Sequence, residues 1–469
     1  MKKLYRFSAI ALLVLPLVFT SCSDYLDRDD DDNITEADVF ARYEKVNGLV
    51  SDVYAAAKKA DRPLVFFEHF SNSAITDECE GTNVEGNITN NFNNGAWNPN
   101  SLPGSVGQYW EALYEGIRKA NLIIENVQKY NTPDNPQQDG DLRNRIGEMY
   151  FMRGYFHMLL LRMYGEAPYI DRVINAGDNM DFKKESVHSM VEKIVTDAQT
   201  AYGMVPNKYV KTSENFGRVD KGACLGLISF VRWVAATPLW NGASQYGYNL
   251  RRVFENEYAY DATRWRKAKE AAKAVLDFEV GGTKRYSLYT KHDANDFKDP
   301  ADGNLNDSRV YARLWDMFYD MDAFANEYVF FMTKSKDQAW QGDIYPPSRE
   351  GSSRQQPVQE QVDEYEYIVG DYGYPVYSAE ARKGGYDDTN PYVKGTRDPR
   401  FYRDVIYHGA PYRNNKNESK TINTASGSDK IGATNATTTG YYLRKFQQES
   451  WNKSGNFSIN APAIWRLPE

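Results

Sequence analysis

Apolar residues recur with a helical period along the first half of the chain. Between residues 108 and 130 they follow steps of three, four and seven, at Trp110, Leu113, Tyr114, Ile117, Ile124 and Val127. Such steps place the side chains on one face of a helix. Residues 142–164 repeat the pattern, and Gly165 and Pro168 are typical of the positions just beyond a helix C-terminus. The two segments predict a pair of packed helices.

Three further helices are predicted, at residues 187–201, 221–236 and 263–278. Ser186 is a suitable N-cap for the first, and Pro238 marks the end of the second. Gly222, Ala223 and Gly226 would allow another helix to approach the second closely. Helices of this length, with small residues facing rings, suggest tetratricopeptide-like antiparallel pairs, although no clean 34-residue repeat is present.

Two regions lack this periodicity. Residues 79–107 are rich in Asn, Gly, Thr and Ser, and residues 280–462 mix short strand-like runs with Gly, Pro and Asn. Loops longer than about 12–15 residues are commonly functional or disordered. We therefore predict a mainly α fold, in which tetratricopeptide-like helical pairs (36–279) form a scaffold and a loop-rich, irregular region (280–469) follows.

The N-terminus indicates export and attachment to a membrane. A basic start and an apolar stretch at 7–19, too short for a transmembrane helix, predict a signal peptide over residues 1–21. Ser21 directly before Cys22 resembles the lipobox of bacterial lipoproteins, although Phe19 replaces its usual Leu; the resemblance implies acylation of Cys22. Secretion with an incidental cysteine is the alternative. The acidic residues 22–35 would form an extended tether, because like charges resist packing.

The composition of the chain reduces the number of possible ligand classes. The chain has 56 basic and 64 acidic residues, a net charge of −8, which argues against nucleic acid as a partner. It is rich in rings, with 35 Tyr, 22 Phe and 9 Trp, and these suit surfaces that are dry on one side and wet on the other. With Cys22 acylated, Cys79 and Cys224 are the only cysteines left, and the sequence leaves open whether they pair.

Motifs for catalysis, cofactors and metals are missing from the sequence. It has no G-x-S-x-G, no G-x-x-x-x-G-K, no H-E-x-x-H and no C-x-x-C. His157 lies within a predicted helix and is expected to be packed or solvated. The run 302–313 begins like a calcium loop with Asp302, Asn304 and Asn306, but Asp307 and Arg313 stand where Gly and Glu are needed. We predict no cofactor and no metal.

Two stretches combine flat rings with polar groups that suit sugar hydroxyls: Trp97, Asn98 and Asn100, and residues 311–319 with Tyr311 and Trp315. Structural packing explains each stretch equally well. The nearby carboxylates Asp77, Glu78 and Glu80 suit loop capping or hydroxyl binding. They also raise the alternative of a glycoside hydrolase, which needs two carboxylates at a fixed separation.

The order of several motifs resembles the SusD/RagB family of outer-membrane nutrient-binding lipoproteins. They are Thr76-Asp77-Glu78-Cys79, Trp97-Asn98-Pro99, YWEALYEGIRKAN at 109–121, MYFMRGYFHMLLLRMYGEAPYI at 149–170, FGRVDKGACLGLISFVRW at 216–233, TPLWNG at 237–242, RDPRFYRDVIYHG at 397–409 and TGYYLRKF at 439–446. The resemblance implies a lipoprotein at the outer face of the outer membrane, lying as a lid on a SusC-like TonB-dependent transporter. Its role would be non-catalytic capture of a glycan or other oligomeric nutrient.

The resemblance also implies site residues. Trp97 with Asn98 or Asn100 falls where the starch-binding member places a stacking Trp and a polar partner, and Asp77 falls in the matching acidic loop. Later aromatic candidates are Tyr311, Trp315 and Trp340. The segment 463–469 is similar to the opening of a family helix that continues in other members, with Pro468 in place of Ala, so a truncated record or gene is expected.

Two alternatives to glycan capture stay open. One is a glycoside hydrolase that uses Asp77 or Glu78. The other is a transporter lid that binds no ligand of its own.

Overall fold

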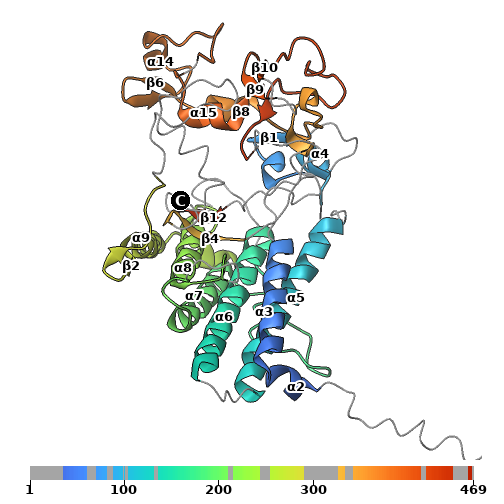
Figure 1. Cartoon of the computed structure of the whole chain (residues 1–469), viewed down its shortest axis with the longest axis vertical. Helices are drawn as coiled ribbons and strands as arrows, with labels where there is room; N and C mark the ends of the chain where they lie inside the picture. Colours follow the sequence, from blue (N-terminus) through green and yellow to red (C-terminus); the bar gives the residue numbers. More distant parts are fainter. Residues whose placement is uncertain are drawn as a thin grey trace, which may run out of the picture.

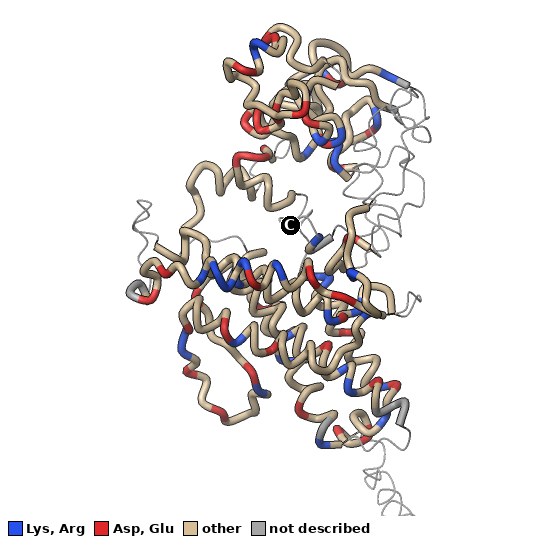
Figure 2. Tube along the Cα trace, turned by 90° about the vertical axis from the view of Figure 1, so that its left-hand side faces the viewer, with Lys and Arg blue, Asp and Glu red and all other residues tan. Residues whose placement is uncertain are grey.

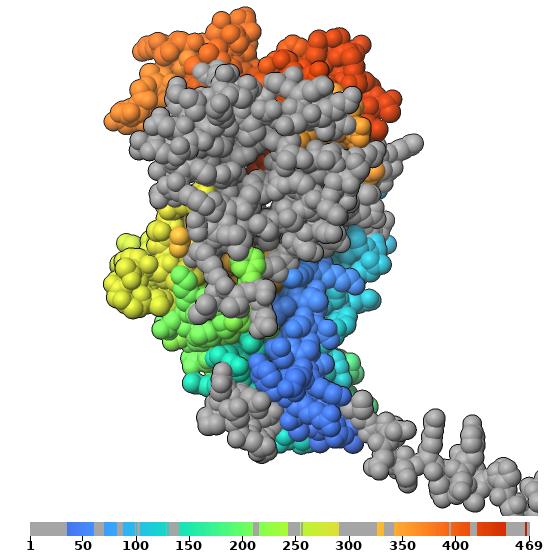
Figure 3. Space-filling model, viewed as in Figure 1, coloured from blue at the N-terminus to red at the C-terminus, as the bar shows by residue number. Residues whose placement is uncertain are grey.

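The computed structural model describes residues 35–60, 70–81, 88–98, 100, 104–130, 136–209, 215–242, 254–289, 326–332, 342–393, 395–413, 419–446 and 463–466. These residues form a helical half and a loop-rich half, which lie at the two ends of the molecule (Figures 1 and 3). The mainly α fold class is confirmed.

The helical half consists of helices that pack on their neighbours in chain order (Figure 1). They are α2 (Glu36–Phe40), α3 (Tyr43–Ala60), α5 (Gly104–Tyr130), α6 (Pro136–Tyr164), α7 (Val187–Met204), α8 (Lys221–Ala236) and α9 (Ala262–Asp277). Helix α5 packs on α6, α6 on α7, α7 on α8 and α8 on α9, while α3 lies against α5 and α6. This arrangement confirms the tetratricopeptide-like helical pairs.

The predicted helix boundaries agree best where a cap marks them. The Ser186 hydroxyl accepts from the Ser189 N–H at 3.1 Å at the start of α7. Asp220 caps α8 in the same way, through the Ala223 N–H at 3.1 Å. Helix α6, in contrast, begins six residues before the predicted position 142, at Pro136. Proline fits the first helical turn, where its missing N–H has no partner to lose.

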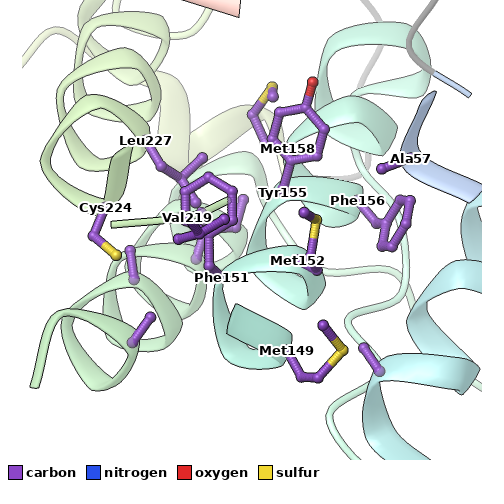
Figure 4. Close-up of a cluster of buried hydrophobic side chains, with 14 of the residues drawn as sticks. Ala57, Met149, Phe151, Met152, Tyr155, Phe156, Met158, Val219, Cys224 and Leu227 are labelled. Atoms are coloured by element: carbon purple, nitrogen blue, oxygen red, sulfur yellow. The ribbon is translucent and has the colours of Figure 1, made fainter. Parts of the chain in front are cut away.

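Helix α6 lies at the centre of the bundle. Every residue from 151 to 161 is buried, so this stretch has no solvent face. Figure 4 shows Met149, Phe151, Met152, Tyr155, Phe156 and Met158 of α6 between Ala57 on one side and Val219, Cys224 and Leu227 on the other. The amphipathic pattern predicted for residues 142–164 is therefore wrong in its middle section, where the apolar residues surround the helix.

Buried charges of α6 are neutralised by the surrounding helices. The Arg153 guanidinium binds the Asp197 carboxylate of α7 at 2.8 Å through Nε and donates to Asn121 Oδ1 of α5 at 3.0 Å. The Tyr169 hydroxyl donates to the same Asp197 carboxylate at 2.7 Å. A buried charge left without such partners would strongly destabilise the fold, so this cluster fixes how α5, α6 and α7 pack.

A second cluster surrounds Glu148, which lies more than one helical turn before Arg153 in α6. Its carboxylate forms an ion pair with Arg145 and another with Arg218 at 2.9 Å. The hydroxyls of Tyr54 (3.0 Å) and Tyr209 (2.6 Å) donate to it as well. The cluster thus ties α3 and the segment before α8 to α6.

The loop-rich half is built from antiparallel pairs of very short strands. The pairs are β1 (Cys79–Gly81) with β5 (Gln355–Pro357), β6 (Tyr367–Val369) with β7 (Tyr372–Tyr374), β8 (Val405–Ile406) with β11 (Tyr442–Leu443), and β9 (Pro411–Arg413) with β10 (Ser419–Thr421). A further pair, β4 (Tyr328–Phe331) with β12 (Ala463–Arg466), lies beside α8 in the helical half (Figure 1). The short helices α4 (Ile88–Asn93), α13 (Gln359–Asp363), α14 (Ala379–Lys383) and α15 (Pro399–Asp404) lie among them; β2 (Glu279–Val280) and β3 (Thr283–Lys284) follow α9.

The glycines of α8 receive side chains from the C-terminal part of the chain. A Cβ on Gly222 would lie 1.7 Å from the Tyr286 hydroxyl oxygen, and one on Gly226 would lie 2.7 Å from a Val329 methyl and 3.1 Å from the Trp465 ring. The predicted role for these glycines, close approach of another helix, is therefore wrong. Residues 463–466, predicted to open a helix, instead form strand β12 on β4.

The two cysteines in the described part of the chain are both free thiols. Cys79 lies in β1 and Cys224 in α8, and both are buried. Among the described helices, none combines the length and the apolar character needed to cross a bilayer.

His157 is buried in α6 as a neutral ring. Its Nδ1 lies 2.8 Å from the Arg153 carbonyl oxygen, and its Nε2 accepts from the Ile170 N–H at 3.0 Å. The ring stacks on Tyr169 with 3.7 Å between the centroids. Burial lowers the pKa of His157 to about 3, because a charged ring would lose its hydration and its acceptor role at Nε2. It is a packed histidine.

We predict that the folded state loses stability as the pH falls below about 6.5. In that range the unfolded chain gains a proton at His157 and the folded chain does not, so the free energy of unfolding decreases by about 1.4 kcal/mol per pH unit from this group. His157→Gln should make the slope of stability against pH shallower by that amount, measured by urea unfolding between pH 5 and 7. Met158→Leu, at the next buried position, should keep the original slope. Equal slopes for His157→Gln and the unchanged protein would contradict the assignment.

Candidate binding site

The segment that carries most of the predicted ligand-binding residues forms a small lobe at one side of the loop-rich half, near β1 and α4 in Figure 1. It contains a 3-10 turn (Asn72–Ile75), strand β1 and helix α4. Strand β1 pairs with β5, with Glu80 opposite Gln356. This pairing attaches the lobe to a part of the chain nearly 300 residues further on.

Partly buried polar contacts hold the lobe and its partner strand β5 in place. Gln355 Oε1 accepts from the Ser71 N–H at 2.9 Å, and the neighbouring Gln356 accepts from the Thr438 N–H at 2.8 Å. Gly81 lies where no side chain fits, because a Cβ there would be 2.2 Å from the Thr89 hydroxyl oxygen. The lobe is therefore closely packed, and this packing holds its surface residues in place.

Trp97 lies in the segment that follows α4. Its ring is partly buried against a small apolar cluster that contains Phe70 and Ala74. It meets the Phe92 ring edge to face, with 4.9 Å between the centroids and an angle of 83°, and Phe92 itself is 39% exposed. This packing fixes the orientation of the indole, which a ring used for stacking requires.

The two predicted asparagines follow Trp97 in a tight turn. Asn98 Oδ1 accepts from the Asn100 N–H at 3.0 Å, and both residues are exposed. The Asn98 side chain thus shapes the turn, while the Asn100 side chain extends from it. We call Trp97, Asn98 and Asn100 the Trp97 turn. A fixed ring beside exposed amides can stack on a sugar and exchange hydrogen bonds with its hydroxyls.

The three carboxylates of the lobe differ in their surroundings. Asp77 is exposed. Glu78 Oε2 accepts from the Ser73 hydroxyl at 2.6 Å, so this carboxylate takes part in loop capping. Glu80 is partly buried, and burial raises its pKa, opposed by a hydrogen bond with Asn93. Of the three, Asp77 is the one most open to a ligand.

Other predicted residues lie outside the described residues. They are Cys22, Tyr311, Trp315, Trp340 and the calcium-like run 302–313. The residues that are described contain no group of three or more side chains placed to ligate a metal ion.

The described residues also line pockets that were not predicted from the sequence, among them the following two. One, of about 630 Å³, is largely apolar and lies beside α5, between Arg118 and Met180. The other, of about 360 Å³, is polar and has Tyr377, Tyr386 and Tyr392 in its wall; we call it the tyrosine pocket. The tyrosines that recur every two to five residues along 365–377 were the available signal for the second pocket.

Comparison with known proteins identifies the family. Residues 24–231 match a SusD-like family described as "starch-binding associating with outer membrane", and residues 322–467 match the SusD family. The chain belongs to the SusD/RagB family.

Individual relatives are distant. The chain is 24% identical to SusD-like protein P2 of Formosa agariphila over 202 residues, which are 42% of this chain. The match covers 38% of that protein, so the chain spans about two-fifths of the length of this curated relative.

Solved structures share the fold at low identity. A SusD-like protein of Bacteroides fragilis has a TM-score of 0.68 at 19% identity, over 92% of this chain and 74% of its own. A SusD-like carbohydrate binding protein of Bacteroides fragilis has a TM-score of 0.64 at 14% identity, over 92% and 72% of the two chains.

We predict that Gly81→Ala loosens the lobe that carries the Trp97 turn. The new methyl group would overlap the Thr89 hydroxyl and the Phe70 ring, 2.9 Å away, so unfolding should become easier by about 1–3 kcal/mol. Urea unfolding followed by tryptophan emission measures this change. Gly48→Ala in α3, where a methyl group meets nothing within 4 Å, is the control and should be neutral or stabilising. Equal loss of stability in both variants would show that Gly81 is not packed as described.

Proposed function

We propose that this protein captures a glycan at the cell surface and delivers it, uncut, to a SusC-like TonB-dependent transporter. The observation that carries the proposal is the Trp97 turn, which presents a ring held by Phe92 beside two exposed amides in a SusD/RagB fold. The family is described as starch-binding and the second Bacteroides fragilis relative as carbohydrate binding, which supports the choice of ligand class.

The proposed binding mode follows from the chemistry of sugars. A pyranose ring has an apolar face of C–H groups that stacks on an indole, and its hydroxyls exchange hydrogen bonds with amides and carboxylates. Asn98, Asn100 and the exposed Asp77 would supply the polar contacts. Tyr311, Trp315 and Trp340 remain proposed aromatic contacts further along the site. Binding in this mode breaks no bond in the sugar.

The proposed location follows from the N-terminus. Acylation of Cys22 would anchor the protein in the outer membrane, and the acidic residues up to position 35 would separate the body from the lipid. A body facing the cell exterior could cover the transporter as a lid and present captured glycan to it.

We predict that Trp97→Ala weakens glycan binding while the fold is kept. Loss of one stacked ring should cost about 1–3 kcal/mol, by analogy with base stacking, which is a ~5- to 150-fold loss of affinity. Affinity electrophoresis against a panel of neutral polysaccharides, followed by calorimetry with the best one, measures the loss. Trp233→Ala is the matched control, because Trp233 is 51% exposed but lies on α8 in the helical half.

The same experiment separates the alternatives. New reducing ends after incubation, lost in Asp77→Asn or Glu78→Gln, would replace the proposal with a glycoside hydrolase. Co-purification with the transporter and unchanged uptake, together with no glycan binding, would favour a lid without a ligand. Equal affinities for Trp97→Ala and Trp233→Ala would remove the Trp97 turn from the binding site.

A further inference from the structure

The tyrosine pocket lies in a part of the loop-rich half that the proposed function does not use. Its wall contains Gln359 and Asp363 of α13, Tyr377 from the segment between β7 and α14, Arg382 of α14, and Asp388 from the segment that follows α14. In Figure 1 the β6 and α14 labels lie at upper left and α4 lies at upper right. None of the residues that line the pocket belongs to the Trp97 turn.

The inner wall of the pocket is rigid. Arg397 is 2% exposed, and its guanidinium donates to the carbonyl oxygens of Tyr365 at 2.9 Å and Val362 at 2.5 Å. The same guanidinium lies 4.9 Å from the centre of the Phe401 ring. Its hydrogen bonds go to the backbone, so Arg397 braces the wall rather than offering a charge to a ligand.

The rim offers both a ring and hydrogen-bonding groups. Tyr377 is 55% exposed and meets the buried Tyr386 ring nearly at right angles, with 6.0 Å between centroids. Asp363 Oδ1 accepts from the Tyr377 hydroxyl at 3.2 Å and from the Gln359 amide at 2.8 Å. These contacts hold the Tyr377 ring in one orientation while leaving more than half of it accessible.

The charges of the pocket are balanced. Asp363 and Asp388 are matched by Arg382 and Arg397, and Arg382 pairs with Asp388 at 2.9 Å, with both side chains about half exposed. A balanced rim attracts neither an anion nor a cation over long range. Its exposed carboxylate and guanidinium can still accept from and donate to neighbouring hydroxyls. This chemistry favours a neutral, hydroxyl-rich ligand with an apolar face.

We propose that the tyrosine pocket is a second sugar-binding site, which holds one short unit of the same neutral polysaccharide that the Trp97 turn binds. The inference rests on the proposed function, since it takes glycan as the ligand class. Its volume of about 360 Å³ suits one or two sugar rings rather than a long segment. Two separate sites on one rigid body bind a long polymer more tightly than either site binds a short piece, because the second contact becomes intramolecular.

Calorimetry with a short neutral oligosaccharide, cut from the best polysaccharide of the panel, tests the second site. The unchanged protein should bind about two molecules, and Tyr377→Ala and Trp97→Ala should each bind about one. Tyr377→Ala should also weaken binding of the whole polymer by about tenfold or more. Tyr372→Ala is the matched control, because Tyr372 is 69% exposed on the neighbouring strand β7 but does not line the pocket.

Asp363→Asn provides a second variant in case Tyr377→Ala disturbs the fold, and circular dichroism checks both. It keeps the size of the side chain and removes the charged acceptor at the rim, so it should also reduce the number of bound oligosaccharides to about one. If the unchanged protein binds one oligosaccharide and Tyr377→Ala binds the polymer as Tyr372→Ala does, the second site is overturned and glycan capture at the Trp97 turn stands. If the unchanged protein binds no glycan in the panel, both proposals fail.

Discussion

The structure depends on the neutralisation of charges inside helix α6. The buried part of a helix is normally apolar, yet α6 carries Arg145, Glu148 and Arg153 among its buried residues. Each would be costly to bury alone, and each is paired with groups from α3, α5, α7 or the segment before α8. Because these partners reach α6 in one geometry, they fix the order and the angles in which the helices pack. The scaffold is therefore defined by polar contacts as much as by apolar burial.

The helical bundle also fixes the position of segments outside its helices. Strand β12 inserts Trp465 against Gly226 of α8, and its ring lies 5.5 Å from Phe330 of β4 and 6.0 Å from Tyr155 of α6. In the other half, β5 holds the lobe of the Trp97 turn by strand pairing. Loops fixed in this way lose little conformational entropy when a ligand binds, which favours affinity. Charges of both signs are interspersed over the helical half (Figure 2), so the aromatic loops rather than a charged face carry the proposed recognition.

The sequence was most informative where a local rule operates. The Ser186 cap of α7 and the end of α8 before Pro238 were correctly predicted, because caps and prolines act within a few residues. The burial of residues 151–161 on all sides was missed, although apolar residues surround the helix in this stretch, because only the apolar residues at helical spacing were considered. The partners of Gly222 and Gly226 were missed because Tyr286, Val329 and Trp465 are remote in sequence. Of the proposed site residues, Trp97, Asn98 and Asn100 lie within four positions of the chain, so their proximity followed from the sequence. The tyrosine pocket assembles from segments that meet only in the fold.

Hydrogen exchange of the protein with and without saturating glycan tests the central claim most directly, since it reports where on an intact molecule the ligand acts. The account predicts slower exchange in peptides that cover 88–98 and 359–392, and unchanged exchange in the fully buried residues 151–161 of α6. Slower exchange confined to the helices α7, α8 and α9, with the loop-rich half unaffected, would contradict it.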